Sequence, residues 1–411
     1  MDGPVRYAAL AAIALTLTLM GCTSPIPSAD PRPTPAQETT VNPTAITAFE
    51  IDIPQADLDD LADRLARTRW PNEIADAGTD YGFPLARLRE LAEYWRTGYN
   101  WRAHEAELNE LPHFTTEIDG QNIHFVHIRS AKPDALPLIL THGWPGSFLE
   151  FLDVIEPLSR DFHLVIPSIP GFGFSGPTHE RGWDTTRVAR AWAELMHRLG
   201  YERYGAQGGD FGSGISQALG ALTPEHVVGV HVNYLPTRPD PAAGLELSET
   251  DRARLDKVQY LMANRPPYQA LQATTPQTIG YALTDSPVGQ LAWIAERFAQ
   301  WTDPRTPVSD ERMLTDVSLY WLTATAASSA RLTRESTRGS APCPVPLGVA
   351  VFAHDITQSV RPLAERLYDI RHWSEFDRGG HFAAMEVPEL LAEDIRTFFL
   401  TDLRTGPDAP R

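Results

Sequence analysis

The stretch from residue 54 to residue 114 shows apolar residues at helical spacing. The first such helix carries Leu58, Leu61 and Leu65, and the second carries Leu88, Leu91 and Trp95. We expect Pro71 to end the first helix, because proline cannot continue the hydrogen-bond ladder, and Gly98 to cap the second. Each helix presents an apolar face, so this N-terminal segment must pack on another part of the chain.

Farther along, the pattern changes to short, near-continuous apolar runs, which are typical of strands buried on both faces of a parallel sheet. These runs lie within residues 137–147, 163–175, 227–234 and 346–355. Amphipathic helices separate them, and the clearest carries Val188, Trp192, Leu195 and Leu199 and ends at Gly200. The alternation of strand and helix predicts an open α/β sheet.

Between about Leu235 and Ala341 the alternation lapses into helical and proline-rich sequence before a strand resumes. We interpret this excursion as a cap over the carboxyl edge of the sheet, where α/β folds bind ligands. The predicted organisation is a signal peptide (1–22), a linker (23–45), an N-terminal helical segment (46–113), an α/β core (114–234 and 341–405) and a helical cap (235–340).

The first 22 residues resemble a bacterial lipoprotein signal. An apolar run follows Arg6 and is shorter than the roughly 20 residues that a helix needs to cross a bilayer. It ends in the sequence LMGC, similar to a lipobox, in which Cys22 is lipidated and becomes the new N-terminus. Met20 and Asp2 depart from the usual pattern, so a plain signal, an uncleaved anchor and a cytoplasmic protein stay open as alternatives. The Pro-, Ser- and Thr-rich residues 23–45 predict an extended membrane tether.

Composition narrows the possible partners. The chain of 411 residues is 42% hydrophobic and has a formal net charge of -18, which argues against nucleic acid as a partner. Its two cysteines, Cys22 and Cys343, could pair, but lipidation of Cys22 would prevent this, and neither lies in a metal-binding pattern. We expect no metal and no organic cofactor, and the oligomeric state stays open.

A glycine-rich stretch around Asp210, with the sequence GGDFG, resembles the strand–turn–helix corner on which hydrolases mount a nucleophile. A phosphate-binding loop and a simple turn are the alternatives, although the acidic partner of a dinucleotide site is missing. A second loop, THGWPG, follows an apolar strand as an oxyanion loop does. Its donor would be the backbone N–H of Trp144, together with that of Phe211, while His142 would hold the loop.

The sequence DRGGHF near the chain end offers His381 as a catalytic base, in the order nucleophile, acid, histidine. Asp355 ends an apolar strand 381 − 355 = 26 residues earlier and could orient this imidazole or, alternatively, cap a helix. The competing residues without a comparable setting are Asp369 and Asp377 as acids and His354 and His372 as bases.

An aspartate nucleophile selects the substrate. Its attack on an acyl group would give an unstable anhydride, whereas displacement at a saturated carbon gives a stable alkyl ester. Asp210 therefore predicts epoxides or haloalkanes as substrates. A halide needs side-chain N–H donors beside the nucleophile, which the phenyl ring of Phe211 lacks, although the Trp144 indole could supply one. An epoxide oxygen needs an acid, and the cap offers Tyr268 and Tyr281.

Four motifs in order, HGWPGS, GGDFGS, PPYQALQATTPQTIGYALTDSPVG and DRGGHFAAME, resemble those of the microsomal-type epoxide hydrolases. The resemblance runs from about residue 49 to residue 399 and includes that family's N-terminal domain. It implies an α/β-hydrolase fold in which Asp210 is the nucleophile, His381 the base, Asp355 the acid and Tyr268 one of two ring-opening tyrosines. At the second tyrosine position the chain has Thr333, for which Tyr281 or Tyr320 would have to compensate.

We therefore expect an enzyme that converts lipophilic epoxides and water to vicinal diols. A haloalkane dehalogenase is the rival with the same chemistry. A catalytically silent, surface-tethered binding protein on the same scaffold is the rival from another class, because Thr333 departs from the family pattern.

Overall fold

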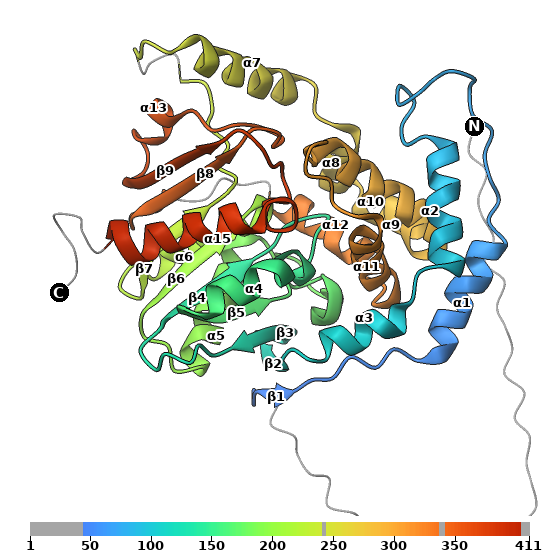
Figure 1. The fold of residues 1–411 in the computed structure, drawn as a ribbon, viewed down its shortest axis with the longest axis horizontal. Helices are drawn as coiled ribbons and strands as arrows, with labels where there is room; N and C mark the ends of the chain where they lie inside the picture. The colour runs from blue at the N-terminus through green and yellow to red at the C-terminus, as the bar shows by residue number, and fades with distance from the viewer. Residues whose placement is uncertain (1–43, 241–243, 337–341, 404–411) are drawn as a thin grey trace, which may run out of the picture. The chain divides into compact units, whose positions relative to one another are not determined.

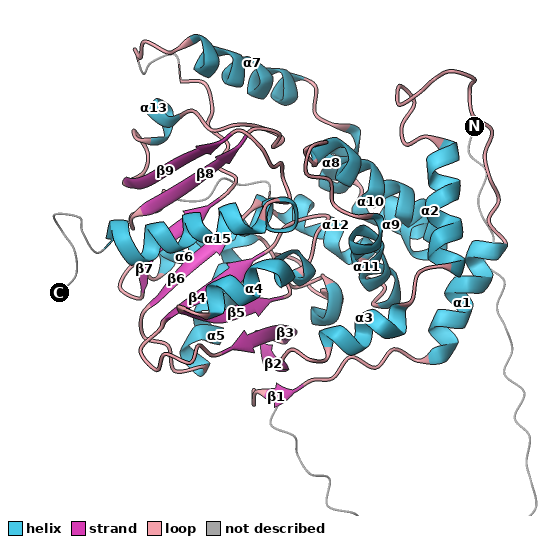
Figure 2. Cartoon of the chain, viewed as in Figure 1, coloured by secondary structure: helices cyan, strands magenta, loops and turns pink. Residues whose placement is uncertain are grey.

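The computed structural model describes residues 44–240, 244–336 and 342–403, and within them a sheet of nine strands forms the core (Figures 1 and 2). The strands are β1 (Thr47–Ala48), β2 (His113–Ile118), β3 (Gln121–Ile128), β4 (Leu136–Thr141), β5 (Phe162–Pro167), β6 (Tyr204–Gly208), β7 (Val227–Val232), β8 (Leu347–Phe352) and β9 (Ile370–Phe376). Their order is β1-β2-β3-β5-β4-β6-β7-β8-β9. The strands from β5 to β9 in this order run parallel, whereas β1, β2 and β3 are antiparallel to their neighbours.

The helices are α1 (Gln55–Ala66), α2 (Leu85–Thr97), α3 (Trp101–Leu108), α4 (Leu152–Ser159), α5 (Thr185–Arg198), α6 (Asp210–Leu222), α7 (Glu249–Ala263), α8 (Pro267–Thr274), α9 (Pro276–Asp285), α10 (Pro287–Trp301), α11 (Asp310–Leu322), α12 (Ala326–Glu335), α13 (Arg361–Ala364), α14 (Ala383–Glu386) and α15 (Pro388–Thr397). Short helical turns are η1 (Phe148–Phe151), η2 (Gly173–Ser175) and the π-helical η4 (Phe398–Asp402).

The central strands are apolar throughout because helices cover the sheet. Every residue of β5, β6 and β8 is buried. Helix α6, with α5 packed beside it, lies against β4, β6 and β7, while α4 and α15 pack together and cross in front of the strands in Figure 1. The predicted α/β fold is confirmed. The helices on the two faces of the sheet bury its apolar residues away from water.

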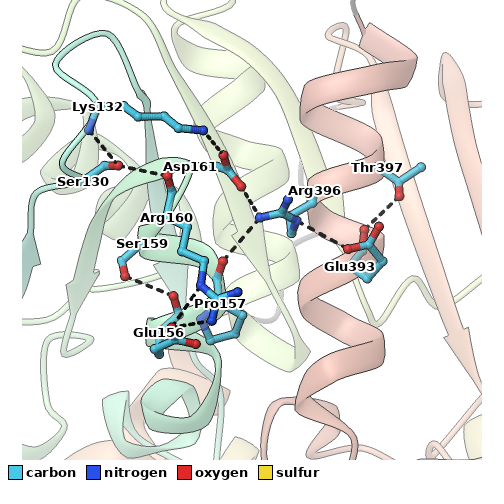
Figure 3. A network of polar contacts seen from close by, with 10 residues as sticks. All are labelled: Ser130, Lys132, Glu156, Pro157, Ser159, Arg160, Asp161, Glu393, Arg396 and Thr397. Carbon is cyan, nitrogen blue, oxygen red and sulfur yellow. Dashed lines mark hydrogen bonds and ion pairs between the residues drawn. The ribbon is translucent and has the colours of Figure 1, made fainter.

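A polar network ties α15 to α4 and to the loop before β4 (Figure 3). The Asp161 carboxylate accepts a hydrogen bond from Lys132 Nζ at 2.5 Å and another from the Arg396 guanidinium of α15. Arg396 also bonds the carbonyl of Pro157, near the end of α4. Lys132 is largely exposed, and exposed ion pairs add little to the free energy of unfolding. The main effect of this network is therefore to orient the two helices.

The N-terminal helices pack against the cap, which comprises α7 to α12 between β7 and β8. Helices α1 and α2 lie against α10, and α3 lies against α11. The indole of Trp95 donates to the Ser318 hydroxyl at 2.8 Å, and the Tyr99 hydroxyl donates to Thr315 at 3.2 Å. The expected helical cap and N-terminal helical extension are therefore confirmed, and the extension braces the cap.

Two helix boundaries expected from the sequence are wrong. Helix α1 stops at Ala66, five residues before Pro71, because the Thr68 hydroxyl donates to the Leu65 carbonyl and competes with further helix. The helical pattern also ends before residue 114, since His113 begins strand β2. Strands β2 and β3 form an antiparallel hairpin with mixed burial, so they lack the continuous apolar runs that mark the central strands. Gly98, by contrast, caps α2 as expected.

The predicted signal peptide, the Cys22 lipidation site and most of the linker lie outside the described residues. Among the helices of the described ranges, none has the length and apolar character needed to span a bilayer. Cys343 is a buried free thiol in this part of the chain, and burial raises its pKa to about 11.

His372 gives the fold a pH dependence with a definite sign. Its Nε2 lies 2.8 Å from Asp394 Oδ1 and its Nδ1 lies 2.7 Å from Asp402 Oδ2. Burial lowers the pKa of His372, but these two carboxylates outweigh burial and raise the pKa above its ordinary value. The ion pairs therefore stabilise the fold fully below the unfolded-state pKa of about 6.5, and this stabilisation is lost as the pH rises through the folded-state value.

We expect His372→Gln to lower the free energy of unfolding by roughly 1.5–3 kcal/mol at pH 6, the worth of charged hydrogen bonds, and by clearly less at pH 9. Urea unfolding at both pH values measures the difference. The matched control is the exposed His179, whose replacement by Gln should leave stability unchanged. An equal loss at the two pH values for His372→Gln would contradict this role of the ion pairs.

Candidate active site

Asp210 occupies a sharp corner where β6 ends and α6 begins. Its φ is +47°, in the left-handed region that residues other than glycine rarely adopt. A Cβ on Gly212 would lie 1.8 Å from the Thr141 carbonyl oxygen, and one on Gly208 would lie 2.3 Å from the Gly212 carbonyl. Only glycine lets the backbone close in this way, and the Asp210 side chain stays 21% exposed.

The loop after β4 presses against this corner and donates to Asp210. The backbone N–H of Trp144 lies 3.0 Å from Asp210 Oδ1. A Cβ on Gly143 would lie 2.3 Å from Asp210 Cβ, so the loop can approach only through glycine. Phe211 is the second residue of α6, where backbone N–H groups have no acceptor within the helix. The structure thus brings the Trp144 and Phe211 N–H groups to the same corner.

His142 holds this loop and does not reach Asp210 through a hydrogen bond. Its ring Nδ1–H donates to the Gly143 carbonyl at 2.9 Å, and its Nε2 accepts the Ile169 N–H at 3.1 Å. Burial lowers the pKa of His142 to about 4, so the ring is neutral at neutral pH. Both nitrogens are occupied, which gives His142 a structural role.

His381 lies between two carboxylates. Its Nδ1 is 2.7 Å from Asp355 Oδ1, and its Nε2 is 3.4 Å from Asp210 Oδ2. The His381 and Asp355 side chains are each only 3% exposed. Burial lowers the pKa of His381, but the negative charges of Asp355 and Asp210 outweigh it and raise the pKa to about 10. The imidazole is therefore protonated at neutral pH.

Trp301 and Glu386, which the sequence analysis missed, hold the His381 loop. The His381 backbone N–H donates to the Trp301 carbonyl at 2.9 Å, and the two rings meet edge to face at 5.0 Å. The Glu386 carboxylate accepts the N–H groups of Phe382 at 2.9 Å and Asp303 at 2.8 Å. Glu386 lies at the end of the DRGGHFAAME motif and could have been noticed from the sequence. Trp301 is 381 − 301 = 80 positions from His381, so no local pattern links the two.

Tyr268 lies on α8 beside the corner. Its ring stacks on Trp144 at 5.3 Å and meets Trp301 edge to face at 5.4 Å, and the Arg297 guanidinium covers it at 4.8 Å. Burial, and then the negative charge of Asp210, raise the pKa of the Tyr268 phenol. The phenol therefore stays protonated at neutral pH and can donate a hydrogen bond or a proton near Asp210.

The residues considered as a second acid lie elsewhere. Tyr281 is 70% exposed, and the buried Tyr320 donates to the Gly146 carbonyl at 2.7 Å. The Thr333 hydroxyl donates to Gln272 Oε1 at 2.8 Å. None of the three is placed as Tyr268 is, so the compensation expected from Tyr281 or Tyr320 is not supported by their positions.

The competing candidates for the acid and the base are committed to other contacts. Asp369 pairs with Arg371 at 2.7 Å, and Asp377 is exposed. His354 faces Asp303 at 3.5 Å, and His372 bonds the carboxylates near the C-terminal helix. Asp355 is thus the candidate acid that contacts His381. One tyrosine that the sequence analysis missed, Tyr234, packs edge to face on the His381 ring at 5.5 Å.

The arrangement has the parts of a two-step displacement. A carboxylate with one oxygen on a backbone N–H can attack a carbon with the other oxygen, and a neighbouring imidazole can then take a proton from water. A phenol can protonate a leaving oxygen. In the ranges that the structure describes, no cluster of three or more His, Cys, Asp or Glu side chains is arranged to hold a metal ion.

Comparison with protein families gives two matches. Residues 46–151 match the family described as epoxide hydrolase N terminus, and residues 137–267 match the alpha/beta hydrolase fold. A Stigmatella aurantiaca relative that carries the name epoxide hydrolase is 46% identical over 86% of this chain and 84% of its own. Epoxide hydrolase 1 of Sus scrofa is 34% identical over 89% of this chain and 90% of its own.

Solved structures give the same result. The structure of the Aspergillus niger epoxide hydrolase is 32% identical with a TM-score of 0.81, over 88% of this chain and 97% of that one. The juvenile hormone epoxide hydrolase of the silkworm Bombyx mori is 32% identical with a TM-score of 0.79, over 86% of this chain and 93% of that one.

The close approach at Gly212 can be tested by substitution. We expect Gly212→Ala to destabilise the fold by about 3 kcal/mol or more, because its Cβ would overlap the Thr141 carbonyl. Gly214→Ala on the same helix is the control, since the nearest atom to its Cβ is 3.8 Å away, and helix propensity predicts a gain of up to about 1 kcal/mol. Urea unfolding compares the two variants, and equal stability would refute the steric account.

Proposed function

The chain belongs to the epoxide hydrolase family, and on that premise we propose that it hydrolyses lipophilic epoxides to vicinal diols through an ester on Asp210. The observation that carries the proposal is the position of Asp210 between the Trp144 N–H, at 3.0 Å, and His381 Nε2, at 3.4 Å. A serine at this corner would favour esters, whereas a carboxylate favours saturated carbon. The aromatic rings of Trp144, Trp301 and Tyr268 suit an apolar substrate.

In the first step Asp210 opens the ring. Asp210 Oδ1 is held by the Trp144 N–H, so Oδ2 is the oxygen that attacks an epoxide carbon. The new bond joins Oδ2 to carbon, the carbon–oxygen bond of the ring breaks, and the ring oxygen takes the Tyr268 proton. The products are a hydroxyalkyl ester on Asp210 and a phenolate on Tyr268.

Ester formation also changes the charge around His381. The resting imidazole is protonated because Asp355 and Asp210 both face it. The ester on Asp210 is neutral, so one of these two charges is lost and the pKa of His381 falls. The His381 proton returns to the Tyr268 phenolate, and His381 becomes a neutral base.

In the second step water cleaves the ester. Neutral His381 takes one proton from water as the water oxygen attacks the Asp210 carbonyl carbon. The oxyanion forms on Oδ1, where the Trp144 N–H already lies. The tetrahedral centre collapses, the bond to the alkyl oxygen breaks, and the diol leaves with the proton from His381. The remaining carboxylic acid protonates His381, which restores the resting site.

A tether to a membrane is part of the proposal. The LMGC sequence that ends at Cys22 supports export as a lipoprotein, with residues 23–45 as the spacer. The enzyme would then meet lipophilic substrates where they partition. Mass analysis of the mature N-terminus should show a lipidated Cys22; an intact Met1 would refute the tether.

Capture of the ester tests the proposed nucleophile. We expect His381→Gln to react with an epoxide and to gain the mass of one substrate on the peptide that contains Asp210, because water is no longer activated. The double variant with Asp210→Ala should gain no mass. A folded His381→Gln protein that forms no adduct with any epoxide converted by wild type would contradict the ester mechanism. Halide release from haloalkanes, measured in parallel, separates a dehalogenase.

Tyr268 is expected to supply the ring-opening proton without a second tyrosine. Tyr268→Phe should therefore lower kcat/KM for an epoxide by about 10²–10⁴-fold, the usual contribution of a general acid. Tyr281→Phe is the matched control and should leave kcat/KM unchanged, since Tyr281 is exposed. Full diol formation by Tyr268→Phe would show that another group protonates the epoxide oxygen.

A further inference from the structure

Glu150 is an acid beside the reacting groups that the steps above do not use. It lies in η1, one turn after the loop that carries Trp144. Its carboxyl group packs on Gly146, where a Cβ would lie 1.5 Å from Glu150 Oε1. Gly146 therefore leaves the space that the Glu150 carboxyl fills.

The same loop connects Glu150 to the nucleophile. The backbone N–H of Gly143 lowers the pKa of the Glu150 carboxyl, which places the two groups near each other. Gly143 is the residue that presses on Asp210, since a Cβ there would lie 2.5 Å from Asp210 Oδ1. The two carboxyl groups thus lie against the same loop, Asp210 at Gly143 and Glu150 at Gly146. The charges of Asp210 and His381 both act on Glu150.

Glu150 as a residue is only partly buried, as Asp210 is, whereas the residues around it in the loop, including Trp144, Ser147 and Phe148, are buried. Burial of the carboxyl group, then the negative charge of Asp316, raise the pKa of Glu150 well above its ordinary value, and His381 opposes this only in part. The oxygens of this carboxyl group can accept a hydrogen bond from a water molecule.

We propose that Glu150 is a further catalytic residue, which binds the water that hydrolyses the Asp210 ester. The inference rests on the proposed function. The water gives one proton to His381 and donates its other O–H to the Glu150 carbonyl oxygen, while its oxygen attacks the Asp210 carbonyl carbon. Glu150 neither gains nor loses a proton, so the balance of the hydrolysis step is unchanged. It orients the water and takes no part in ring opening.

The test separates the two half-reactions. Wild type and Glu150→Met are mixed with a converted epoxide, quenched over time, and analysed for ester by intact mass and for diol. We expect Glu150→Met to form the ester within about threefold of the wild-type rate, and to hydrolyse it about 10–100-fold more slowly, so that the ester accumulates. Glu150→Gln keeps the carbonyl oxygen and should stay within about fivefold of wild type in both steps.

The controls decide between catalysis and loop support. Glu156→Gln, an exposed acid one helix away, should change neither step. If Glu150→Met slows ester formation and hydrolysis equally, or accumulates no ester, Glu150 only supports the loop and the inference is overturned. If Glu150→Met does not fold, Glu150→Asp replaces it. Its carboxyl group is one methylene shorter, and this variant must then accumulate the ester.

The failure of the proposed function can be told apart from the failure of the inference. A wild type that forms neither ester nor diol would overturn the proposed function itself. Diol formation by wild type, without accumulation of the ester in the variants, would overturn the inference alone.

Discussion

The burial of His381 between two carboxylates is the constraint on which the rest of the site depends. A buried imidazolium is unfavourable unless charges and hydrogen bonds offset its desolvation. Asp355, at 2.7 Å, and Asp210, at 3.4 Å, provide this offset and raise the pKa of His381 to about 10. One of them, Asp210, is also the proposed nucleophile. In the proposed mechanism, the ester on Asp210 removes one of these two charges, so His381 changes from an acid into a base when water has to be activated.

This pairing requires backbone contacts that only glycine permits. Asp210 reaches His381 from a strained corner, and the corner closes because Gly212 and Gly143 have no side chains. The cap holds the His381 loop, because the carbonyl of Trp301 at the end of α10 accepts the His381 backbone N–H. The N-terminal helices α1 and α2 pack on α10 in turn. The helical extension therefore contributes to the position of the base, although it lies far from it in the sequence.

Sequence patterns predicted those parts of the fold whose signals are local. Apolar runs marked the central strands, and Asp210, His381 and Asp355 stood out because each follows a strand or a glycine pair. The antiparallel hairpin of β2 and β3 escaped notice because its residues are only partly buried. Trp301 and Glu150 also escaped, since their roles arise from contacts that folding creates. For the same reason, sequence could raise Tyr281 and Tyr320 as acids, and only the structure could show that one is exposed and the other bonded to a carbonyl.

In the proposed mechanism the enzyme, and not water, supplies the oxygen that opens the epoxide. A single turnover in water enriched in oxygen-18, with enzyme in excess over epoxide, tests this most directly. We expect the first diol to carry no label and one labelled oxygen to appear in the peptide containing Asp210. Label in the diol from the first turnover, with none in the protein, would show direct attack by water and would exclude an ester on Asp210.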